Sequence, residues 1–243
     1  MKNYYIASVS FGKDSLAMLL KLIKSNYPLD EVIYYNTGME FKAIYNIRDK
    51  ILEILDRYNI KFTELKPNLD FEYKMFNKPV KHRNGTIGYG YSWCGGKCRW
   101  GTSDKLQAIK KYYRDTFPAR DCIIYEYVGI AFDEQSRAGK GTNKLYPLID
   151  WKMTEKDCLD FCYSEGFTWE EDGIELYDIL DRVSCWCCAN KNKKELKNYY
   201  LYLPNYWNKL LDMQRKTERP FSKNINLLEL DKIFREEDKD VKN

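Results

Sequence analysis

The sequence predicts an α/β protein: a five-stranded parallel sheet flanked by helices, with a C-terminal helical appendage. Short β-branched and aromatic runs alternate with longer runs of helix formers, which is typical of βαβ units with right-handed crossovers. The strand-like runs are also mostly apolar, as in strands covered on both faces. The expected strands are Tyr4–Ser10, Glu31–Asn36, Lys61–Leu65, Cys122–Ile130 and Lys144–Ile149, and the expected helices cover residues 14–25, 41–58, 102–113 and 154–165.

Composition bounds the class of protein. The 243 residues suffice for one sizeable α/β domain, expected over residues 1–190, and a helical extension over residues 191–243. A net charge of +4 permits a polyanionic partner without demanding one. No apolar run approaches the length of a membrane span, and no signal peptide precedes the first strand, so we expect a cytoplasmic protein with reduced cysteines and no membrane partner. An oligomer is compatible with this composition.

The loop after the first expected strand has the composition of a phosphate-binding turn. A strand that passes through a tight turn into a helix leaves backbone N–H groups free to bind an anion. Gly12 lets the backbone approach a ligand, and Lys13 adds a positive charge that Asp14 can orient, so these two charged residues are the expected catalytic pair. Only one glycine precedes the lysine, so the loop is not a Walker A motif. The expected binding residues here are Ser8, Ser10, Phe11, Gly12, Lys13, Asp14 and Ser15.

Several segments together resemble one protein family. Residues 10–15 resemble the PP-loop of the ATP pyrophosphatase superfamily, and residues 35–38, 129–137 and 146–151 resemble later motifs of the phosphoadenosine phosphosulfate (PAPS) reductase family, in family order. The resemblance implies an adenine nucleotide alpha-hydrolase-like fold. It also implies that ATP, adenylyl sulfate (APS) or PAPS binds at the carboxyl ends of the strands. The further nucleotide-binding residues that it implies are Asn36, Thr37, Gly38, Gly129, Glu134 and Arg137.

Two departures from the family pattern favour ATP-driven activation over reduction. Ala131 stands where the family has an arginine, and bidentate arginine contacts normally recognise sulfate or phosphate. The family's reductases attack sulfur with a C-terminal cysteine, whereas no cysteine follows Cys188 here. Relatives with an intact PP-loop use ATP instead. We therefore expect a transferase that cleaves ATP to AMP and pyrophosphate to activate a substrate for sulfur transfer, with a nucleic-acid or protein acceptor and a sulfur donor such as a cysteine desulfurase.

Four cysteines in two close pairs have the layout of a four-thiolate metal site. Cys94 and Cys98 lie in a stretch rich in glycine and aromatic residues, residues 67–101, and Cys185 and Cys188 form a Cys-x-x-Cys pair. Four thiolates suit Zn²⁺ or an iron–sulfur cluster, and the spacing does not choose between them. The resemblance to cluster-containing sulfonucleotide reductases favours [4Fe–4S], although the first pair in those enzymes is adjacent. We expect the stretch to be a lid and metal-binding loop over the nucleotide.

Two other functions stay open. One is a sulfonucleotide reductase in which Cys187 or a partner protein supplies the nucleophile. The other is a non-catalytic nucleotide or nucleic-acid binding module with a structural zinc, because Lys191–Tyr200 mixes basic and aromatic residues as nucleic-acid surfaces do. The same pattern is typical of an amphipathic helix with a solvated lysine face. Cys158 and Cys162 are four residues apart on one expected helix face, where we expect core thiols.

Overall fold

The computed structural model describes residues 2–93, 98–118, 121–139 and 141–242, and the chain divides by its packing into two compact units. The first unit comprises residues 1–36, 40–66 and 106–171, and the second comprises residues 37–39, 67–105 and 172–243. The domain boundary expected at residue 190 stays a prediction.

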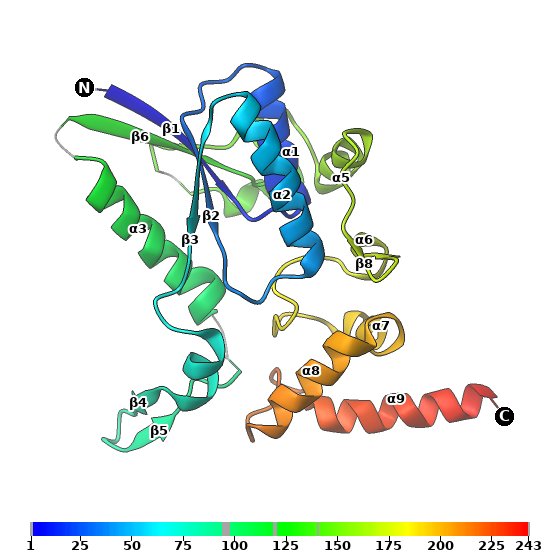
Figure 1. Cartoon of the computed structure of the whole chain (residues 1–243). Coiled ribbons are helices and arrows are strands. Elements are labelled where there is room, and N and C mark those ends of the chain that lie inside the picture. Colours follow the sequence, from blue (N-terminus) through cyan, green and yellow to red (C-terminus); the bar gives the residue numbers. More distant parts are fainter. Residues whose placement is uncertain (1, 94–97, 119–120, 140, 243) are drawn as a thin grey trace. The chain divides into compact units, whose positions relative to one another are not determined.

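A parallel sheet forms the centre of the first unit (Figure 1). In the described part of the chain it has five strands in the order β3-β2-β1-β6-β7. Ala7 of the central strand is in register with Val32 on one side and Tyr127 on the other. The predicted fold class is therefore confirmed. The strands are β1 (Lys2–Val9), β2 (Glu31–Tyr35), β3 (Lys61–Leu65), β6 (Cys122–Val128) and β7 (Lys144–Leu145).

Helices cover both faces of this sheet (Figure 1). On one face Ile109 of α3 packs with Ile6 and Ile33 of the strands in a buried apolar cluster. The other face is covered by α1 and α2, which follow the first two strands. The helices of this unit are α1 (Lys13–Lys24), α2 (Lys42–Arg57), α3 (Lys105–Thr116), α4 (Pro147–Asp150) and α5 (Glu155–Ser164), with a 3-10 helix η3 (Phe132–Arg137) and the short strand β8 (Glu170–Glu171).

The fifth expected strand is shorter than the sequence pattern suggested. It ends at Leu145, and Pro147 begins α4 only two residues later. Proline lacks the N–H that a sheet ladder needs, and its fixed φ suits the first turn of a helix. The expected strand over Lys144–Ile149 is therefore a two-residue strand followed by a helical turn.

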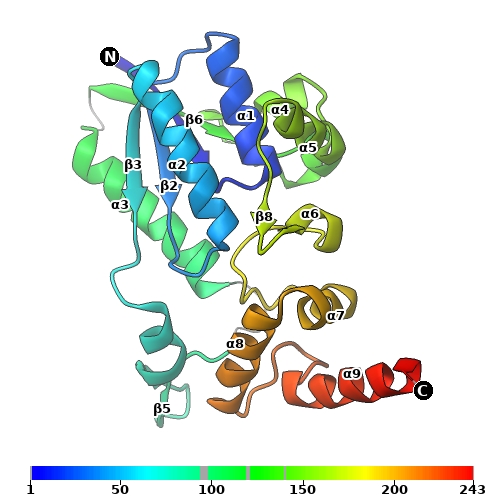
Figure 2. The same cartoon turned by 45° about the vertical axis from the view of Figure 1, so that its right-hand side comes forward.

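The second unit contains the expected C-terminal helices (Figure 2). Trp207 of α8 stacks on Phe234 of α9 with ring centroids 5.7 Å apart, and its indole N–H donates to Asp231 at 2.8 Å. None of the helices formed by the described residues is both long and apolar enough to cross a membrane. The elements after residue 172 are β9 (Ile174–Glu175), α6 (Leu176–Ile179), α7 (Lys193–Tyr202), α8 (Pro204–Arg215) and α9 (Leu227–Lys242).

The glycine- and aromatic-rich stretch 67–101 is not one continuous loop. It contains the π-helix η1 (Tyr73–Asn77) and an antiparallel hairpin of β4 (Pro79–Lys81) and β5 (Ile87–Tyr89). A second π-helix, η2 (Arg99–Asp104), leads directly into α3. The role of residues 67–101 as a lid and metal-binding loop over a nucleotide stays a prediction.

Candidate nucleotide-binding site

The turn between β1 and α1 is held in place by a buried aromatic side chain. Phe11 has a left-handed backbone with φ of 58°, which is costly for a residue with a large side chain. Its ring is buried against Tyr34, with centroids 4.9 Å apart. The indole N–H of Trp169 donates to the Phe11 carbonyl at 2.8 Å. Packing on the ring and a hydrogen bond on the carbonyl thus offset the backbone cost and fix the turn.

The serine hydroxyls tie the two ends of the turn together. The Ser10 N–H donates to Ser15 Oγ at 3.1 Å, and the two hydroxyl oxygens lie 3.2 Å apart. The Ser15 hydroxyl also donates to the Gly12 carbonyl at 3.2 Å. Both predicted hydroxyl donors therefore shape the turn.

Gly129, just after β6, touches the start of α1. A Cβ on this glycine would lie 2.8 Å from Ser15 Cα and 3.0 Å from Ser15 N. Both of these are backbone atoms, so no side chain could move aside to make room. Glycine is therefore required for this close approach, and the part of Gly129 in nucleotide binding stays a prediction.

Lys13 is buried among carboxylates at the start of α1. Only 7% of the residue is exposed. Its ammonium forms an ion pair with Glu155, the first residue of α5, and lies 3.7 Å from Asp14 Oδ1. That second distance is too long for a hydrogen bond. The predicted lysine thus has a carboxylate partner that the sequence pattern did not suggest, because 142 residues separate the two.

Asp14 is unfavourably placed as an anion. Its pKa is raised from 3.8 to about 6, chiefly by burial, with the opposing effect of Lys13 and the smaller raising effects of Glu155 and Glu134 included. Its Oδ1 atom is buried without a hydrogen-bond partner. An unsatisfied buried carboxylate oxygen beside a lysine is unusual in a purely structural turn and is common at binding sites.

The other predicted nucleotide-binding residues of the first unit lie at the ends of strands or on the following helix. Asn36 follows β2, donates to Glu64 at 3.0 Å and accepts from the Tyr45 hydroxyl at 3.0 Å. Ser8 lies within β1, in register with β2 and β6. On η3 the Arg137 guanidinium forms an ion pair with Glu134 and is more than half exposed. The structure therefore places Gly129 against the loop and Glu134 in the electrostatic surroundings of Asp14, whereas Asn36 and Arg137 bond to other side chains.

Thr37 and Gly38 belong to the second unit. The Thr37 hydroxyl oxygen accepts from the Met39 N–H at 3.2 Å and lies 3.3 Å from Cys185 Sγ. Gly38 has φ of +80° with open space around its Cβ position, so glycine is favoured there by backbone conformation alone. Their part in nucleotide binding stays a prediction.

Residues 4–121, which include the loop and its flanking strand and helix, match the model of the phosphoadenosine phosphosulfate reductase domain. The match covers 118 of the 243 residues of the chain. An uncharacterized protein of Methanocaldococcus jannaschii is 23% identical over 238 residues, which cover 89% of this chain and 42% of that protein. The chain thus spans less than half the length of this curated relative. The resemblance to the PAPS reductase family drawn from the motifs is confirmed.

The predicted metal-binding cysteines all fall within the second unit of this PAPS reductase-like chain. Cys94 lies outside the described residues. Cys98 Sγ accepts from the Gly101 N–H at 3.2 Å, and the Cys188 N–H donates to the Cys185 carbonyl at 3.1 Å in a tight turn. Among the residues that the structure describes, no three His, Cys, Asp or Glu side chains are grouped so that they could hold a metal ion. The predicted four-thiolate site, which includes Cys94, stays a prediction.

Three further thiols are buried. Cys187, the alternative nucleophile, is only 3% exposed. Cys158 and Cys162 on α5 are confirmed as core residues, and the Cys162 thiol donates to the Lys13 carbonyl at 3.5 Å. Burial raises the pKa of Cys162 to about 12 and that of Cys158 still higher, so both remain neutral thiols without nucleophilic character.

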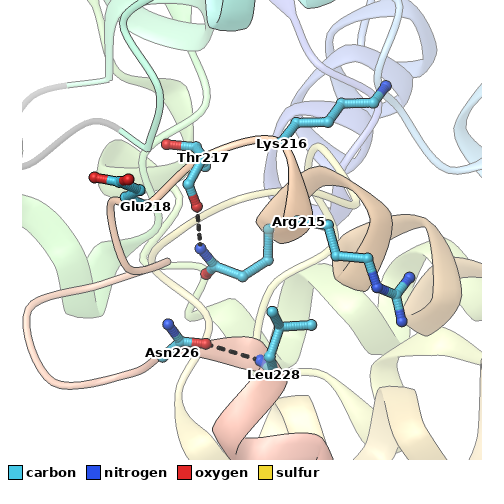
Figure 3. A pocket seen from close by; sticks show the side chains of 7 residues that line it. Arg215, Lys216, Thr217, Glu218, Asn226 and Leu228 are labelled. Atoms are coloured by element: carbon cyan, nitrogen blue, oxygen red, sulfur yellow. Dashed lines mark hydrogen bonds between the residues drawn. The ribbon is translucent and has the colours of Figure 1, made fainter.

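A separate hollow of about 300 Å³ lies at the connection from α8 to α9 (Figure 3). The Gln214 amide N–H groups donate to the carbonyls of Thr217 and Arg219, at 3.1 and 2.9 Å, and its oxygen accepts from the Phe221 N–H at 3.1 Å. The buried amide is therefore fully used in shaping the connection, and we assign the hollow no ligand. It is lined by Gln214, Arg215, Lys216, Thr217, Glu218, Asn226 and Leu228.

Proposed function

We propose that this protein binds ATP or a related adenine nucleotide at residues 10–15 and cleaves it to AMP and pyrophosphate, so that a substrate is activated for sulfur transfer. The observation that carries the proposal is the buried Lys13 at the start of α1, at the carboxyl end of a parallel strand. A cation at the N-terminus of a helix suits the phosphates of a nucleotide. The PAPS reductase domain match, which covers the whole loop, supports the same ligand class.

In the proposed reaction an acceptor atom attacks the α-phosphorus of ATP. A bond forms between acceptor and phosphorus, the bond from the α-phosphorus to the bridging oxygen breaks, and pyrophosphate leaves with the electron pair. Lys13 would offset the charge that develops on the phosphate oxygens, and the α1 N–H groups would hold them. The terminal sulfur of a persulfide donor then attacks the activated atom of the acceptor, whose bond to the AMP oxygen breaks so that AMP leaves with the electron pair. A second thiol of the donor cleaves the resulting disulfide by thiol–disulfide exchange, which leaves a thiol on the acceptor and a disulfide in the donor. The acceptor that we propose is a nucleic acid or a protein.

Lys13 also sets a requirement on binding. Its ammonium is paired with Glu155, so an incoming phosphate has to compete with that carboxylate or share the lysine with it. Asp14, beside the same lysine, has a pKa of about 6 and would repel a phosphate less when it is protonated. The carboxyl groups of Glu155 and Asp14 therefore set the net charge that a nucleotide would meet beside Lys13.

The test is release of labelled pyrophosphate from ATP in the presence of candidate acceptors. We expect Lys13→Met to reduce release at least about 100-fold, because it removes the only charge at the loop that favours phosphate. The matched control is Lys24→Met, at the other end of α1, where the lysine pairs with Glu165 and is largely exposed. Release of phosphate alone by the wild type, or full activity in Lys13→Met, would disprove the proposal.

Sulfite release from APS or PAPS with thioredoxin tests the alternative reductase in the same preparation. The burial of Cys187 counts against that thiol as an accessible nucleophile, so we favour the ATP-dependent reaction.

A metal held by Cys94, Cys98, Cys185 and Cys188 is a separate part of the proposal, and no step of the reaction above depends on it. It is supported by the two cysteine pairs in one compact unit. Anaerobic purification followed by iron and zinc analysis tests it. Bound iron with visible absorbance would indicate a [4Fe–4S] cluster, and a colourless protein with one bound zinc ion would indicate a structural site. A wild-type protein with neither metal would exclude both.

A further inference from the structure

The β4–β5 hairpin exposes an apolar and aromatic face. Pro79 is paired with Tyr89 and Lys81 with Ile87, and residues paired across an antiparallel ladder share one face. All four residues are exposed, Tyr89 to 72% and Ile87 to 64%. An isolated exposed tyrosine is ordinary, but a short strand pair that presents an aromatic ring, an aliphatic side chain and a lysine on one face is a candidate contact surface.

The segment around this face has a strong positive charge. Residues 73–103 contain six basic side chains and no aspartate or glutamate, although the whole chain has a net charge of only +4. Within the described ranges, no acidic side chain pairs with Lys78, Lys81 or Arg83, which all lie in or beside the hairpin. Lys78 and Arg99 instead lie over the ring of Tyr91, at 5.5 and 4.4 Å from its centroid. Lys74 is paired with Asp104, but the charges of Lys78, Lys81 and Arg83 are available to a partner.

The hairpin is firmly built. The N–H groups of Gly90, Tyr91 and Ser92 donate to the carbonyls of Lys78, Lys74 and Met75, at 2.8 to 3.0 Å. A Cβ on Gly90 would lie 2.1 Å from the Met75 carbonyl oxygen, so the strand end packs directly on the π-helix η1. The turn is closed by the His82 N–H, which donates to the Thr86 carbonyl at 2.8 Å. A surface held this way needs little ordering when a partner binds.

The geometry points to a single-stranded nucleic acid as the partner of this hairpin. Phosphates match the unpaired cations of Lys81 and Arg83, and a base can stack on the exposed Tyr89 ring, which together are the two elements of single-strand binding. An acidic peptide would use the charges but leave the aromatic ring without a flat partner. The hairpin goes beyond the proposed nucleotide site, because none of its residues belongs to the loop or to the first unit.

The segment that the sequence predicted to contact nucleic acid, Lys191–Tyr200, supports the choice of the hairpin by contrast. Its Lys191 is buried and paired with Glu195 at 2.8 Å, and the Tyr199 hydroxyl donates to the Trp186 carbonyl at 2.9 Å. Tyr200 and Lys197 bond to acidic residues of α9. This segment is an amphipathic helix whose aromatic residues are used internally, so its two exposed lysines, Lys193 and Lys194, serve as a matched control.

The test measures fluorescence anisotropy of a labelled single-stranded oligonucleotide of about 20 nucleotides with the full-length protein, without ATP, at several salt concentrations. The double variant Lys81→Gln/Arg83→Gln should bind roughly 10-fold more weakly at low salt, with a slope of log K against log salt reduced by about 1.4. Tyr89→Ala should bind roughly 10-fold more weakly with an unchanged slope, because it removes stacking and no charge. The control Lys193→Gln/Lys194→Gln should bind like the wild type.

Three results would overturn the assignment: wild-type binding by both hairpin variants, a larger loss in the α7 control, or competition by polyglutamate as effective as that by unlabelled oligonucleotide. The last would indicate an acidic protein partner. Tyr89→Leu keeps an apolar side chain at this exposed position and should lose the stacking part of the affinity if Tyr89→Ala proves poorly folded. Pyrophosphate release is measured separately from oligonucleotide binding. If the protein binds the oligonucleotide but does not cleave ATP, only the proposed function is disproved. If it cleaves ATP but does not bind the oligonucleotide, only the role of the hairpin is disproved.

Discussion

The loop of the first unit and the hairpin of the second both offer cations to an anionic ligand, but they hold them in opposite ways. Lys13 is buried, paired with Glu155 and close to a second carboxylate, Asp14. Lys81 and Arg83 are exposed and, among the described residues, have no acidic partner. A buried cation can interact strongly with a ligand, but here the ligand has to compete with the carboxylate that already pairs with the cation. Exposed cations interact more weakly with a ligand, and salt screens these interactions readily. This difference favours a small ligand bound selectively at the loop and a polymer bound with little selectivity at the hairpin.

The substitution that we expect to damage the loop of the first unit most is Gly129→Val. The added side chain would meet the backbone of Ser15, so we expect nucleotide binding to be lost and the free energy of unfolding to fall by about 3 kcal/mol. Isothermal titration with ATP and urea unfolding measure the two effects. Oligonucleotide binding in the folded protein should not change, because Gly129 and the hairpin belong to different units.

Gly141→Ala is the matched control for that substitution. Its new Cβ would meet only Lys144 Cγ, at the ordinary contact distance of 3.9 Å, so binding and stability should be preserved. A Gly129→Val protein that still binds ATP with wild-type affinity would show that the nucleotide does not use this turn.

The pH dependence of stability separates the enclosed site from the open surface. Folding raises the pKa of Asp14 from 3.8 to about 6, so the folded chain keeps this proton to higher pH than the unfolded chain does. The contribution of Asp14 to stability is therefore most favourable below about pH 4 and decreases as the pH rises through about 6. At about 1.4 kcal/mol per pKa unit, with a quarter of the side chain exposed, the full change is on the order of 2 kcal/mol.

Asp14→Asn should remove this slope, because an amide cannot ionise. Urea unfolding of both proteins at about pH 4.5 and pH 7.5 measures it, and the variant should gain most at the higher pH. An equal difference between variant and wild type at both pH values would show that Asp14 does not carry a raised pKa, and the view of the loop as an electrostatically strained site would be wrong.

The sequence was a good guide wherever the determining residues are neighbours in the chain. The strand over Lys61–Leu65 was predicted to the residue, because a short run that mixes Phe62, Thr63 and Leu65 with charged residues and stops before Pro67 carries its own signal. The loop motif was also local. Glu155 could not be predicted as a partner of Lys13, because its sequence context indicates only the first turn of a helix after the Thr154 cap. Long-range pairing depends on the folded arrangement of the first unit, which no short motif encodes.

The two lysine- and tyrosine-rich segments show the same limit from the other side. Residues 191–200 and residues 73–91 both contain several lysines and tyrosines, but only the first segment was predicted to bind nucleic acid. In the structure α7 directs Tyr199 into the core, whereas the hairpin register places Tyr89 on an exposed face. Periodicity could have suggested the buried face of α7, but the register of a three-residue strand pair is set by its turn and by packing on η1.

A pair of tyrosine substitutions gives the smallest and most direct test of that difference. Tyr199→Phe removes the hydroxyl of a fully buried tyrosine, which donates to the Trp186 carbonyl at 2.9 Å, so the free energy of unfolding should fall by about 1 kcal/mol. Tyr89→Phe removes an exposed hydroxyl and should change stability by less than about 0.5 kcal/mol. Oligonucleotide affinity should stay near the wild-type value in both, because phenylalanine keeps the stacking ring at position 89 and Tyr199 is not accessible to a ligand. Urea unfolding combined with anisotropy measures both quantities, and a stability loss as large in Tyr89→Phe as in Tyr199→Phe would mean that the hairpin face is covered in the folded protein and is not free to bind a partner.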